Sequence, residues 1–287
     1  TVMQKIWVCG ARGQIVQAVN DVVDKLEFEM LDTDVDDLDV TDTDEVLRFG
    51  EMNRPDIIIN CSGMTDIAAC EENPSRAFKV NALGARNLAI VAAKMQAKMV
   101  QLSTDDVFDG KSTEPYTEFD LVNPGTVYGK SKLAGENYVK EFTTKHFIVR
   151  STWVYGKGQN FISDFLKKVD AGEQLSIASD QFGSPTSANE LARFLLHLVH
   201  TSEYGTYHAT NKGVCSRYAF AQEILKMTGK TASMQPVPTV MSDFSKVRPA
   251  YAVLDNFIMS MVPIYDFPDW QDSLREYLEE RGLYHAE

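Results

Sequence analysis

The stretch Lys5-Ile6-Trp7-Val8-Cys9-Gly10-Ala11-Arg12-Gly13-Gln14-Ile15-Val16 decides the fold, because two glycines separate a short apolar run from a helical pattern. We expect a buried strand over residues 5–9 and a helix over residues 15–26. Gly10 and Gly13 would let the backbone turn tightly and approach a phosphate group at the N-terminus of the helix. The stretch therefore predicts the first strand–turn–helix unit of a sheet that binds a dinucleotide.

Apolar runs and helical patterns continue to alternate through the first half of the chain. Further strands are expected over residues 27–31, 56–61, 98–102 and 146–150, and further helices over residues 43–51, 75–96 and 126–144. Near-continuous apolar strands separated by helices are typical of a parallel sheet that is covered on both faces. We therefore predict an α/β protein with a doubly wound parallel sheet of the Rossmann type.

The second half of the chain is less regular, and six of the ten prolines in the whole chain follow Ser184. Helices are expected over residues 161–171, 189–200 and 217–228, with a short strand over residues 207–209. We predict a smaller α/β lobe that binds the substrate beside the carboxyl ends of the strands. The predicted dinucleotide-binding domain is residues 1–152 with 187–212 returning to it, and the predicted substrate-binding lobe is residues 153–186 and 213–287.

Composition narrows the classes of function. The net charge of -13 argues against nucleic acid as a partner, because a phosphate backbone needs a basic face. The four cysteines are far apart and lack C-x-x-C spacing, so we expect buried reduced thiols rather than a zinc site or disulfides. The sequence shows no charged leader and no apolar run of 18 residues, so we expect a soluble, cytoplasmic protein with no membrane partner.

Several residues near the first turn are candidates for binding a dinucleotide. Asp32 ends the second predicted strand, where a carboxylate commonly accepts from the adenosine ribose hydroxyls and disfavours a 2′-phosphate. This favours NADH, although Arg12 could offset it by meeting a phosphate. Asp39 and Val40 could bound the adenine. The alternative for these residues is a solvated acidic loop, because residues 32–44 contain seven aspartates.

The predicted strands end in residues that suit a ligand crevice. Small residues follow the strand over 56–61, hydroxyl and carboxyl groups follow the strand over 98–102, and an aromatic residue follows the strand over 146–150. Carboxyl ends of parallel strands meet at one edge of a sheet, where open α/β sheets bind ligands. The residues concerned are Cys61, Ser62, Gly63, Thr65, Thr104, Asp105, Asp106 and Trp153.

Tyr128 and Lys132 are four residues apart in a predicted helix, so their side chains would project from one face. A nearby ammonium favours the phenolate and lowers the pKa of the tyrosine toward the range where proton transfer works. The alternative is an exposed helix start in which the spacing occurs by chance. Their place beside the crevice favours an acid that serves catalysis.

The sequence contains the motifs G-x-x-G-Q from Gly10, S-T-D-x-V-F-D-G from Ser103, Y-G-K-S-K-L-A-G-E from Tyr128, R-S-T-W-V-Y-G from Arg150, D-Q-F-G-S-P-T from Asp180, and R-P at Arg248 followed by Leu254-Asp255. Through these motifs the chain resembles the extended short-chain dehydrogenase/reductase superfamily and, within it, is similar to the dTDP-4-dehydrorhamnose reductase family over nearly its whole length.

The resemblance implies reduction of the C4 ketone of a nucleotide-linked 4-keto-6-deoxysugar by NADH or NADPH, with dTDP-4-dehydro-L-rhamnose giving dTDP-L-rhamnose. Tyr128 would donate the proton, Lys132 would lower its pKa and bind the nicotinamide ribose, and Thr104 would donate to the carbonyl oxygen. Gln14 and Ile15 would join the glycine turn in binding the cofactor. The implied substrate contacts are Thr104, Asp105, Asp106, Trp153, Gln181, Phe182, Ser184, Pro185 and Arg248. A homodimer is compatible with the resemblance.

The chain departs from the family pattern at several positions. Asp106 stands where a tyrosine is usual, so a second hypothesis keeps the reaction and changes the sugar or nucleotide. A third hypothesis is a catalytically silent, regulatory relative. Some relatives bind magnesium through glutamates, but Ala18 is near the corresponding position, so no metal is predicted. The other departures are Val16 for glycine, Ala252 for serine and Arg217 for tryptophan.

Overall fold

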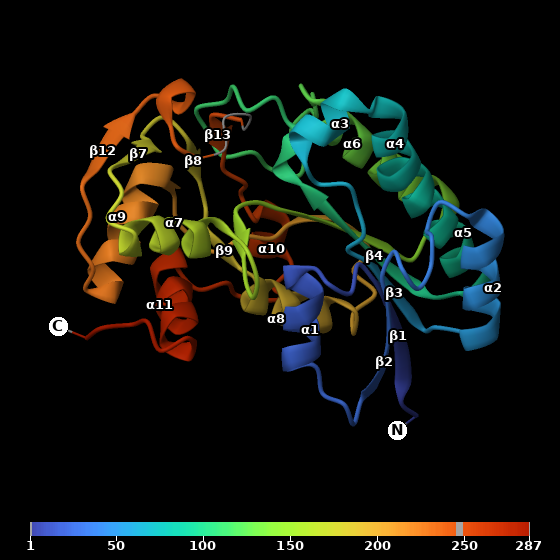
Figure 1. The fold of residues 1–287 in the computed structure, drawn as a ribbon. Helices are drawn as coiled ribbons and strands as arrows, with labels where there is room; N and C mark the ends of the chain where they lie inside the picture. Colours follow the sequence, from blue (N-terminus) through green and yellow to red (C-terminus); the bar gives the residue numbers. More distant parts are fainter. Residues whose placement is uncertain (1, 245–248, 287) are drawn as a thin grey trace.

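The large sheet of the molecule has six strands. The computed structural model describes residues 2–244 and 249–286. Neighbouring strands in this sheet all run parallel, in the order β10-β5-β4-β3-β1-β2 (Figure 1). The strands are β1 (Gln4–Cys9), β2 (Phe28–Thr33), β3 (Ile57–Asn60), β4 (Lys98–Thr104), β5 (His146–Ser151) and β10 (Gly205–His208). The predicted parallel sheet is confirmed.

Helices cover both faces of this sheet. Side chains alternate between the two faces along each strand, so one strand contributes residues to the core on each face. Ile6 and Val8 of β1 belong to a core cluster with α1 and α8, whereas Trp7 and Cys9 belong to a second cluster with α2, α5 and α6. The covering helices are α1 (Gln14–Val22), α8 (Ala188–Leu198), α2 (Thr43–Asn53), α5 (Gly84–Met95) and α6 (Val127–Phe142). This arrangement confirms the doubly wound fold.

The strand order reverses between β1 and β3. The chain passes from β1 to β2 on one side and then places β3 on the other side of β1. Cys9 and Asn60 are partners in register at the ends of these two strands, so Gly10 and Cys61 follow them side by side. In open α/β sheets, ligands bind beyond the carboxyl ends of the strands at such a switch point. The fold therefore directs a crevice to the glycine turn.

The predicted helix over residues 75–96 has an irregular middle. It consists of α4 (Pro74–Phe78), a π-helical turn η1 (Lys79–Leu83) and α5. The turn carries the buried Asn81, whose Oδ1 accepts from the backbone N–H of Met64 (2.8 Å) and whose Nδ2 donates to the Met64 carbonyl (3.0 Å) and to Ser131 Oγ (2.9 Å). Such turns are frequent at functional sites. Asn81 thus fastens the loop after β3 to α6.

A smaller lobe of short strands and helices lies beside the large sheet, on the left of Figure 1. Its core contains Phe165, Phe220 and Leu274, one from each of three helices. Its strands form three small sheets, β11-β8-β13, β12-β7 and β6-β9. The elements are β6 (Val154–Tyr155), α7 (Phe161–Asp170), β7 (Leu175–Ala178), β8 (Phe182–Gly183), β9 (Thr186–Ser187), β11 (Cys215–Ser216), α9 (Arg217–Thr228), β12 (Met234–Val237), β13 (Tyr251–Ala252) and α11 (Trp270–Glu280).

The division of the chain into two domains stays a prediction. The pairing of β10 with β5 and the packing of α8 on the large sheet support the assignment of residues 187–212 to the dinucleotide-binding part. The remaining short elements are α3 (Ile67–Glu72), η2 (Asp105–Val107), η3 (Thr239–Met241) and α10 (Phe257–Met261). In residues 2–244 and 249–286, no helix is long and apolar enough to cross a membrane.

Candidate active site

The turn after β1 approaches the end of β3 more closely than a side chain would allow. Gly10 has a φ of +91°, and a Cβ at this position would lie 2.8 Å from the carbonyl carbon and oxygen of Cys61. Gly13 precedes α1 and has no side chain to cap it, which leaves the first backbone N–H groups of the helix to a ligand. The turn therefore has the geometry that a phosphate group needs.

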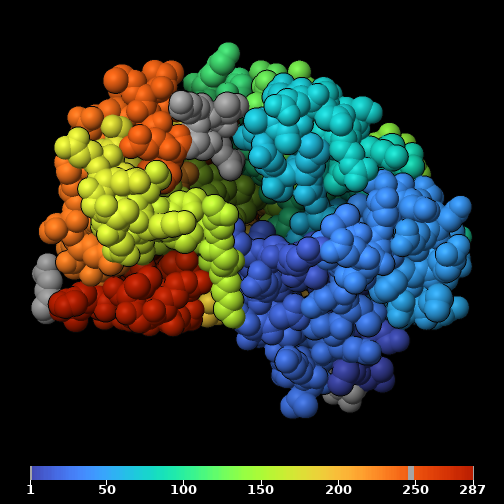
Figure 2. All heavy atoms as spheres, in the orientation of Figure 1, coloured from blue at the N-terminus to red at the C-terminus, as the bar shows by residue number. Residues whose placement is uncertain are grey.

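A cavity of about 460 Å³ opens beyond this turn, at the ends of β1, β2 and β3. Figure 2 shows the molecular surface hollowed where the large lobe, blue to cyan, meets the smaller lobe, yellow to orange. The predicted cofactor-binding residues that line the cavity are Gly10, Gly13, Asp39, Val40, Cys61, Ser62, Gly63 and Thr65. Its size suits a small organic ligand or cofactor.

Three of the predicted cofactor-binding residues have other positions. Gln14 Oε1 accepts from the backbone N–H of Gly156 (2.7 Å) and from Asn160 Nδ2 (3.2 Å), so its side chain joins the turn to the smaller lobe. Ile15 packs against the core cluster of α1 and α8. Arg12 is exposed and faces the acidic loop after β2. These three residues are not among those that line the cavity, and their role in binding the cofactor stays a prediction.

The carboxylate at the end of β2 is Asp34 rather than Asp32. β2 extends to Thr33, because the Thr33 carbonyl accepts from the backbone N–H groups of the glycine turn. Asp32 is exposed, and its Oδ2 accepts from Asn20 Nδ2 (2.7 Å) on α1. Asp34 lines the cavity. Sequence reasoning missed Asp34 because it ended the strand two residues early.

Helix α6 begins against the turn that follows β4. Thr126 Oγ1 caps the helix by accepting from the backbone N–H of Gly129 (3.0 Å). A Cβ on Gly129 would overlap the carbonyl oxygen of Asp106, so glycine allows the helix to start at this place. Tyr128, which immediately precedes Gly129, is buried to 8% exposure. The helix start therefore holds Tyr128 next to the end of β4.

Lys132 lies one helical turn after Tyr128 and approaches Gly63, which lines the cofactor cavity. Its Nζ donates to the carbonyl oxygen of Leu102 (2.8 Å) and lies 3.9 Å from the position that a Cβ of Gly63 would occupy. Burial lowers the pKa of Lys132, while Cys61 and Glu136 oppose the shift. The buried amine thus lies beside Gly63, and Tyr128 precedes Lys132 by one turn on the same face of α6.

A buried ion pair lies beneath this helix. Glu136 Oε1 and Arg150 Nη2 are 2.6 Å apart, and Arg150 Nε also bonds to the carboxylate. Ser103 Oγ donates to Glu136 Oε2 (2.5 Å), and Arg150 Nη1 lies 3.3 Å from His208 Nε2. The group links α6 to β4, β5 and β10. Sequence reasoning assigned no role to this pair, although both residues occur in the motifs that carry the resemblance.

Hydroxyl and carboxyl groups converge at the end of β4. Thr104 Oγ1 lies 3.4 Å from Asp105 Oδ1 and 3.3 Å from Asp106 Oδ2, and it accepts from the backbone N–H of Asp106 (3.1 Å). All three residues are buried. An aspartate at position 106 therefore puts a carboxyl group next to the Thr104 hydroxyl.

Trp153 follows β5 and contacts the smaller lobe. Its φ of +48° is in the left-handed region, which is uncommon for a residue with a bulky side chain. A Cβ on Gly183 of β8 would overlap the indole ring of Trp153. In a second contact, the guanidinium carbon of Arg217 lies 3.7 Å from the centroid of this ring. The indole is therefore held by two partners from the smaller lobe.

The predicted loop after β7 is mostly buried. Gln181, Ser184 and Pro185 are buried, whereas Phe182 is 40% exposed. Ser184 Oγ donates to the carbonyl oxygen of Gly213 (2.6 Å), so its hydroxyl serves the fold of the lobe. Arg248 lies outside the described residues.

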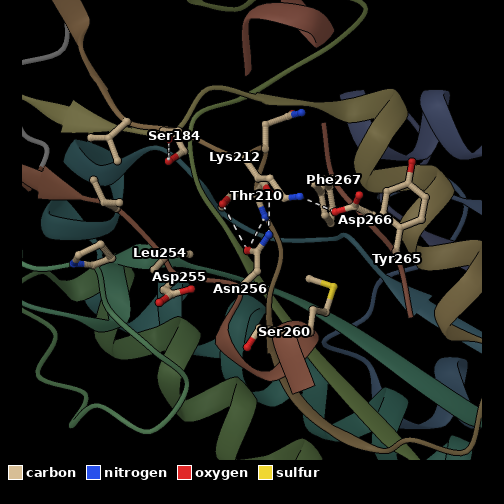
Figure 3. A pocket seen from close by; sticks show the side chains of 16 residues that line it. Ser184, Thr210, Lys212, Leu254, Asp255, Asn256, Ser260, Tyr265, Asp266 and Phe267 are labelled. Carbon is tan, nitrogen blue, oxygen red and sulfur yellow. Dashed lines mark hydrogen bonds and ion pairs between the residues drawn. The ribbon is translucent and has the colours of Figure 1, made fainter. Parts of the chain in front are cut away.

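Ser184 also lines a second cavity of about 400 Å³, shown in Figure 3. Lys212 Nζ forms an ion pair with Asp266 (2.5 Å), and Asn256 Oδ1 accepts from the backbone N–H of Thr210 (3.0 Å). These groups satisfy one another across segments that follow β10 and β13. Within residues 2–244 and 249–286, no group of three or more His, Cys, Asp or Glu is arranged to hold a metal ion.

Comparison with known proteins agrees with this architecture. The RmlD substrate binding domain family matches residues 3–282. The spore coat polysaccharide biosynthesis protein SpsK of Bacillus subtilis (strain 168) is 35% identical over 281 residues, which cover 98% of this chain and 99% of SpsK.

Two solved structures are also similar. A dTDP-4-dehydrorhamnose reductase (RfbD ortholog) of Clostridium acetobutylicum superposes with a TM-score of 0.94 at 40% identity, covering 97% of this chain and 100% of the other. The dTDP-4-dehydrorhamnose reductase of Bacillus anthracis, solved in complex with NADP, gives a TM-score of 0.93 at 34% identity, covering 98% of this chain and 99% of the other. The chain belongs to the RmlD substrate-binding domain family of reductases.

Proposed function

We propose that this protein uses NADH or NADPH to reduce the C4 ketone of dTDP-4-dehydro-L-rhamnose, giving dTDP-L-rhamnose. The observation that carries the proposal is the position of Lys132, which is one helical turn from Tyr128 and adjacent to Gly63 of the cofactor cavity. The Clostridium and Bacillus anthracis structures are both named dTDP-4-dehydrorhamnose reductase, which supports the proposed substrate. The Bacillus anthracis structure contains NADP, which supports a nicotinamide dinucleotide as the cofactor.

We assign Tyr128 as the proton donor in this reduction. When bound, the nicotinamide supplies the hydride, and the oxygen of the ketone then needs a proton. The Lys132 ammonium has three N–H bonds and gives one to Leu102 among the described residues, so it retains donors for the nicotinamide ribose. Its positive charge favours the Tyr128 phenolate, which makes the phenol a better acid.

Thr104 is the proposed donor to the developing oxyanion, because its hydroxyl lies at the carboxyl end of β4 beside the start of α6. Asn81 and the Glu136–Arg150 pair are proposed positioning residues, since they hold α6 against the loop after β3 and against β5. Arg217 on Trp153 would bring positive charge to the diphosphate of an anionic substrate in an acidic protein.

Tyr128→Phe tests the proton assignment. We expect kcat to fall at least 100-fold, in line with the usual contribution of a general acid, while NADH binding changes less than threefold. Tyr138→Phe is the matched control, because Tyr138 is on the same helix and packs against Phe142 away from the site. If Tyr128→Phe retained turnover, Tyr128 would not be the proton donor.

A different nucleotide ketosugar is the second candidate, and Asp106 favours it. A buried carboxyl group beside Thr104 replaces an aromatic contact and would repel a substrate anion nearby. Asp106→Tyr should move the ratio of kcat/KM between two ketosugars at least tenfold. An unchanged ratio would show that this position does not set the sugar.

A regulatory relative without activity is the third candidate. It predicts that the cofactor binds while no nucleotide-linked ketosugar is reduced. We also propose a cytoplasmic location and keep the homodimer as a prediction. Cell fractionation and light scattering of the purified protein test these two statements.

A further inference from the structure

The first residue of α1 is bonded across the boundary between the two lobes. Gln14 follows Gly13, which lines the cofactor cavity. The Oε1 atom of Gln14 accepts from the backbone N–H of Gly156 (2.7 Å) and from Asn160 Nδ2 (3.2 Å). Both donors belong to the segment between β6 and α7, by which the chain enters the smaller lobe. The start of α1 is therefore fastened to this segment.

Asn160 extends the contact to two helices of the smaller lobe. Its Nδ2 also donates to the carbonyl oxygen of Gly156 (2.8 Å) and lies 3.2 Å from the hydroxyl oxygen of Tyr277 on α11. Its Oδ1 accepts from the backbone N–H of Ser163 (3.1 Å) and thereby caps α7. A change in the position of the Gln14 amide is thus felt by both α7 and α11.

The backbone at Gly156 packs closely on the large lobe. A Cβ at this position would lie 2.8 Å from the Cβ of Ala188, which begins α8, and 3.3 Å from the Cβ of Gln14. Lys157 adds an ion pair with Asp21 of α1 (2.6 Å), but both side chains are about half exposed, and such pairs contribute little. The Gln14 amide is therefore the stronger of the two polar contacts.

Trp153 lies three residues before Gly156 on the same short segment. The two residues between them form β6, which pairs with β9, and the Trp153 carbonyl accepts from the backbone N–H of Thr186 (3.1 Å). This pairing leaves the segment little freedom between its two ends. The position of Gly156 therefore helps to set the position of Trp153, a predicted substrate contact.

A cofactor in the glycine turn would act on Gln14 first. A phosphate group at a helix start accepts from the backbone N–H groups of the first helical residues, and Gln14 is the first residue of α1. Ordering the backbone of Gln14 also restricts its side chain. A ligand that orders one segment lowers the entropic cost of ordering the next, which produces positive coupling between two ligands.

We infer that Gln14 is a positioning residue that couples cofactor binding to ketosugar binding, because its amide holds residues 153–160 in place when the turn is occupied. The inference rests on the proposed function of the site and adds this coupling to it. Gln14 is not among the residues that line the cavity, so its side chain acts through Gly156 and Trp153. Coupling of this kind is reciprocal and typically changes an affinity about 5- to 150-fold.

The test is hydrogen exchange of the whole protein, measured by mass spectrometry on peptides that cover residues 153–160. Exchange is compared without NADH and at a concentration that saturates the protein in a fluorescence titration. We expect NADH to slow exchange in the wild type at least about fivefold. Gln14→Met keeps the length of the side chain and removes the acceptor, so NADH should slow exchange less than about twofold. Gln14→Ala should give the same result if the methionine variant does not fold.

Gln17→Met is the matched control, because Gln17 is on the same helix and its Nε2 donates to the carbonyl oxygen of Arg12 (2.9 Å), within the large lobe. Its exchange should respond to NADH as that of the wild type does. In steady-state kinetics, Gln14→Met should raise the KM for the ketosugar at least about fivefold and change kcat less than about twofold, since Gln14 does not contact the reacting atoms.

Two results would overturn the inference. In the first, NADH slows exchange in Gln14→Met as strongly as in the wild type, which would mean that the cofactor protects the segment without Gln14. In the second, NADH binds to the wild type and leaves exchange in residues 153–160 unchanged. Exchange needs no turnover, so an enzyme inactive on every ketosugar would defeat the proposed function and leave the effect of NADH on this segment measurable.

Discussion

Replacing Arg150 with methionine should destabilise the protein severely while keeping the volume of the side chain. Arg150 and Glu136 are almost fully buried, with side chains 4% and 0% exposed, and Glu136 accepts from two guanidinium nitrogens and from Ser103. The Arg150→Met variant leaves the Glu136 carboxylate buried without its cation. Breaking a buried pair in this way typically costs about 3–5 kcal/mol.

The assay is urea unfolding monitored by tryptophan fluorescence, together with thermal melting. A loss of about 3–5 kcal/mol corresponds to a fall in Tm of about 10 °C for a chain of this size. Activity should fall as well, because Glu136 is one helical turn after Lys132 and holds the same helix. The reference for both measurements is the wild-type protein at the same pH and salt concentration.

A double variant separates the loss of the pair from the loss of packing. Arg150→Met combined with Glu136→Leu removes both charges, and replacing a buried pair by apolar residues is often neutral or stabilising. The double variant should therefore recover most of the stability lost by Arg150→Met. A single variant that loses less than about 1 kcal/mol, or a double variant no more stable than the single one, would refute the reasoning.

Three further predictions concern the turn, Trp153 and the pH dependence. Gly10→Ala should weaken NADH binding at least tenfold in the titration, because its Cβ would meet the backbone of Cys61; wild-type affinity would contradict the tight turn. Gly183→Ala should raise the KM for the ketosugar by displacing Trp153, with NADH binding unchanged. An unchanged KM would argue against a contact between Trp153 and the substrate. Burial and the charge of Arg150 lower the pKa of His208 from 6.5 to about 3, so the unfolded chain binds the proton first. The free energy of unfolding should therefore fall as the pH drops below 6.5, by up to about 1.4 kcal/mol per pH unit. In urea unfolding between pH 6.5 and 5, His208→Gln should depend less on pH than the wild type does. Equal pH dependence of the two proteins would contradict this assignment to His208.

The doubly wound sheet could be predicted because its strands are apolar on both faces. The spacing of apolar residues predicted the strands of the large sheet and the helices that cover it. The glycine turn after the first strand predicted where the ligand crevice lies. The two-residue strands of the smaller lobe could not be predicted, since their pairing depends on contacts between distant segments. β8, for example, pairs with β11 and β13, which are more than 30 residues further along the chain.

Several of the predicted cofactor-binding residues line one cavity, and the differences from the expected positions have local causes. Asp34 was missed because β2 is extended by hydrogen bonds between Thr33 and the glycine turn, which periodicity does not register. Gln14 has a helical position next to the turn, but its amide is used to join the smaller lobe. Asn81 was expected as one residue of a long helix, whereas the structure places it in a π-helical turn with contacts to two other segments.

The proposed activity is tested most directly by mixing the purified protein with NADH and dTDP-4-dehydro-L-rhamnose and following absorbance at the nicotinamide band. We expect NADH to be oxidised in proportion to the sugar consumed, dTDP-L-rhamnose to be formed, and Tyr128→Phe to abolish the reaction. Measurable NADH binding without oxidation of the cofactor, in the presence of this substrate, would contradict the proposed function.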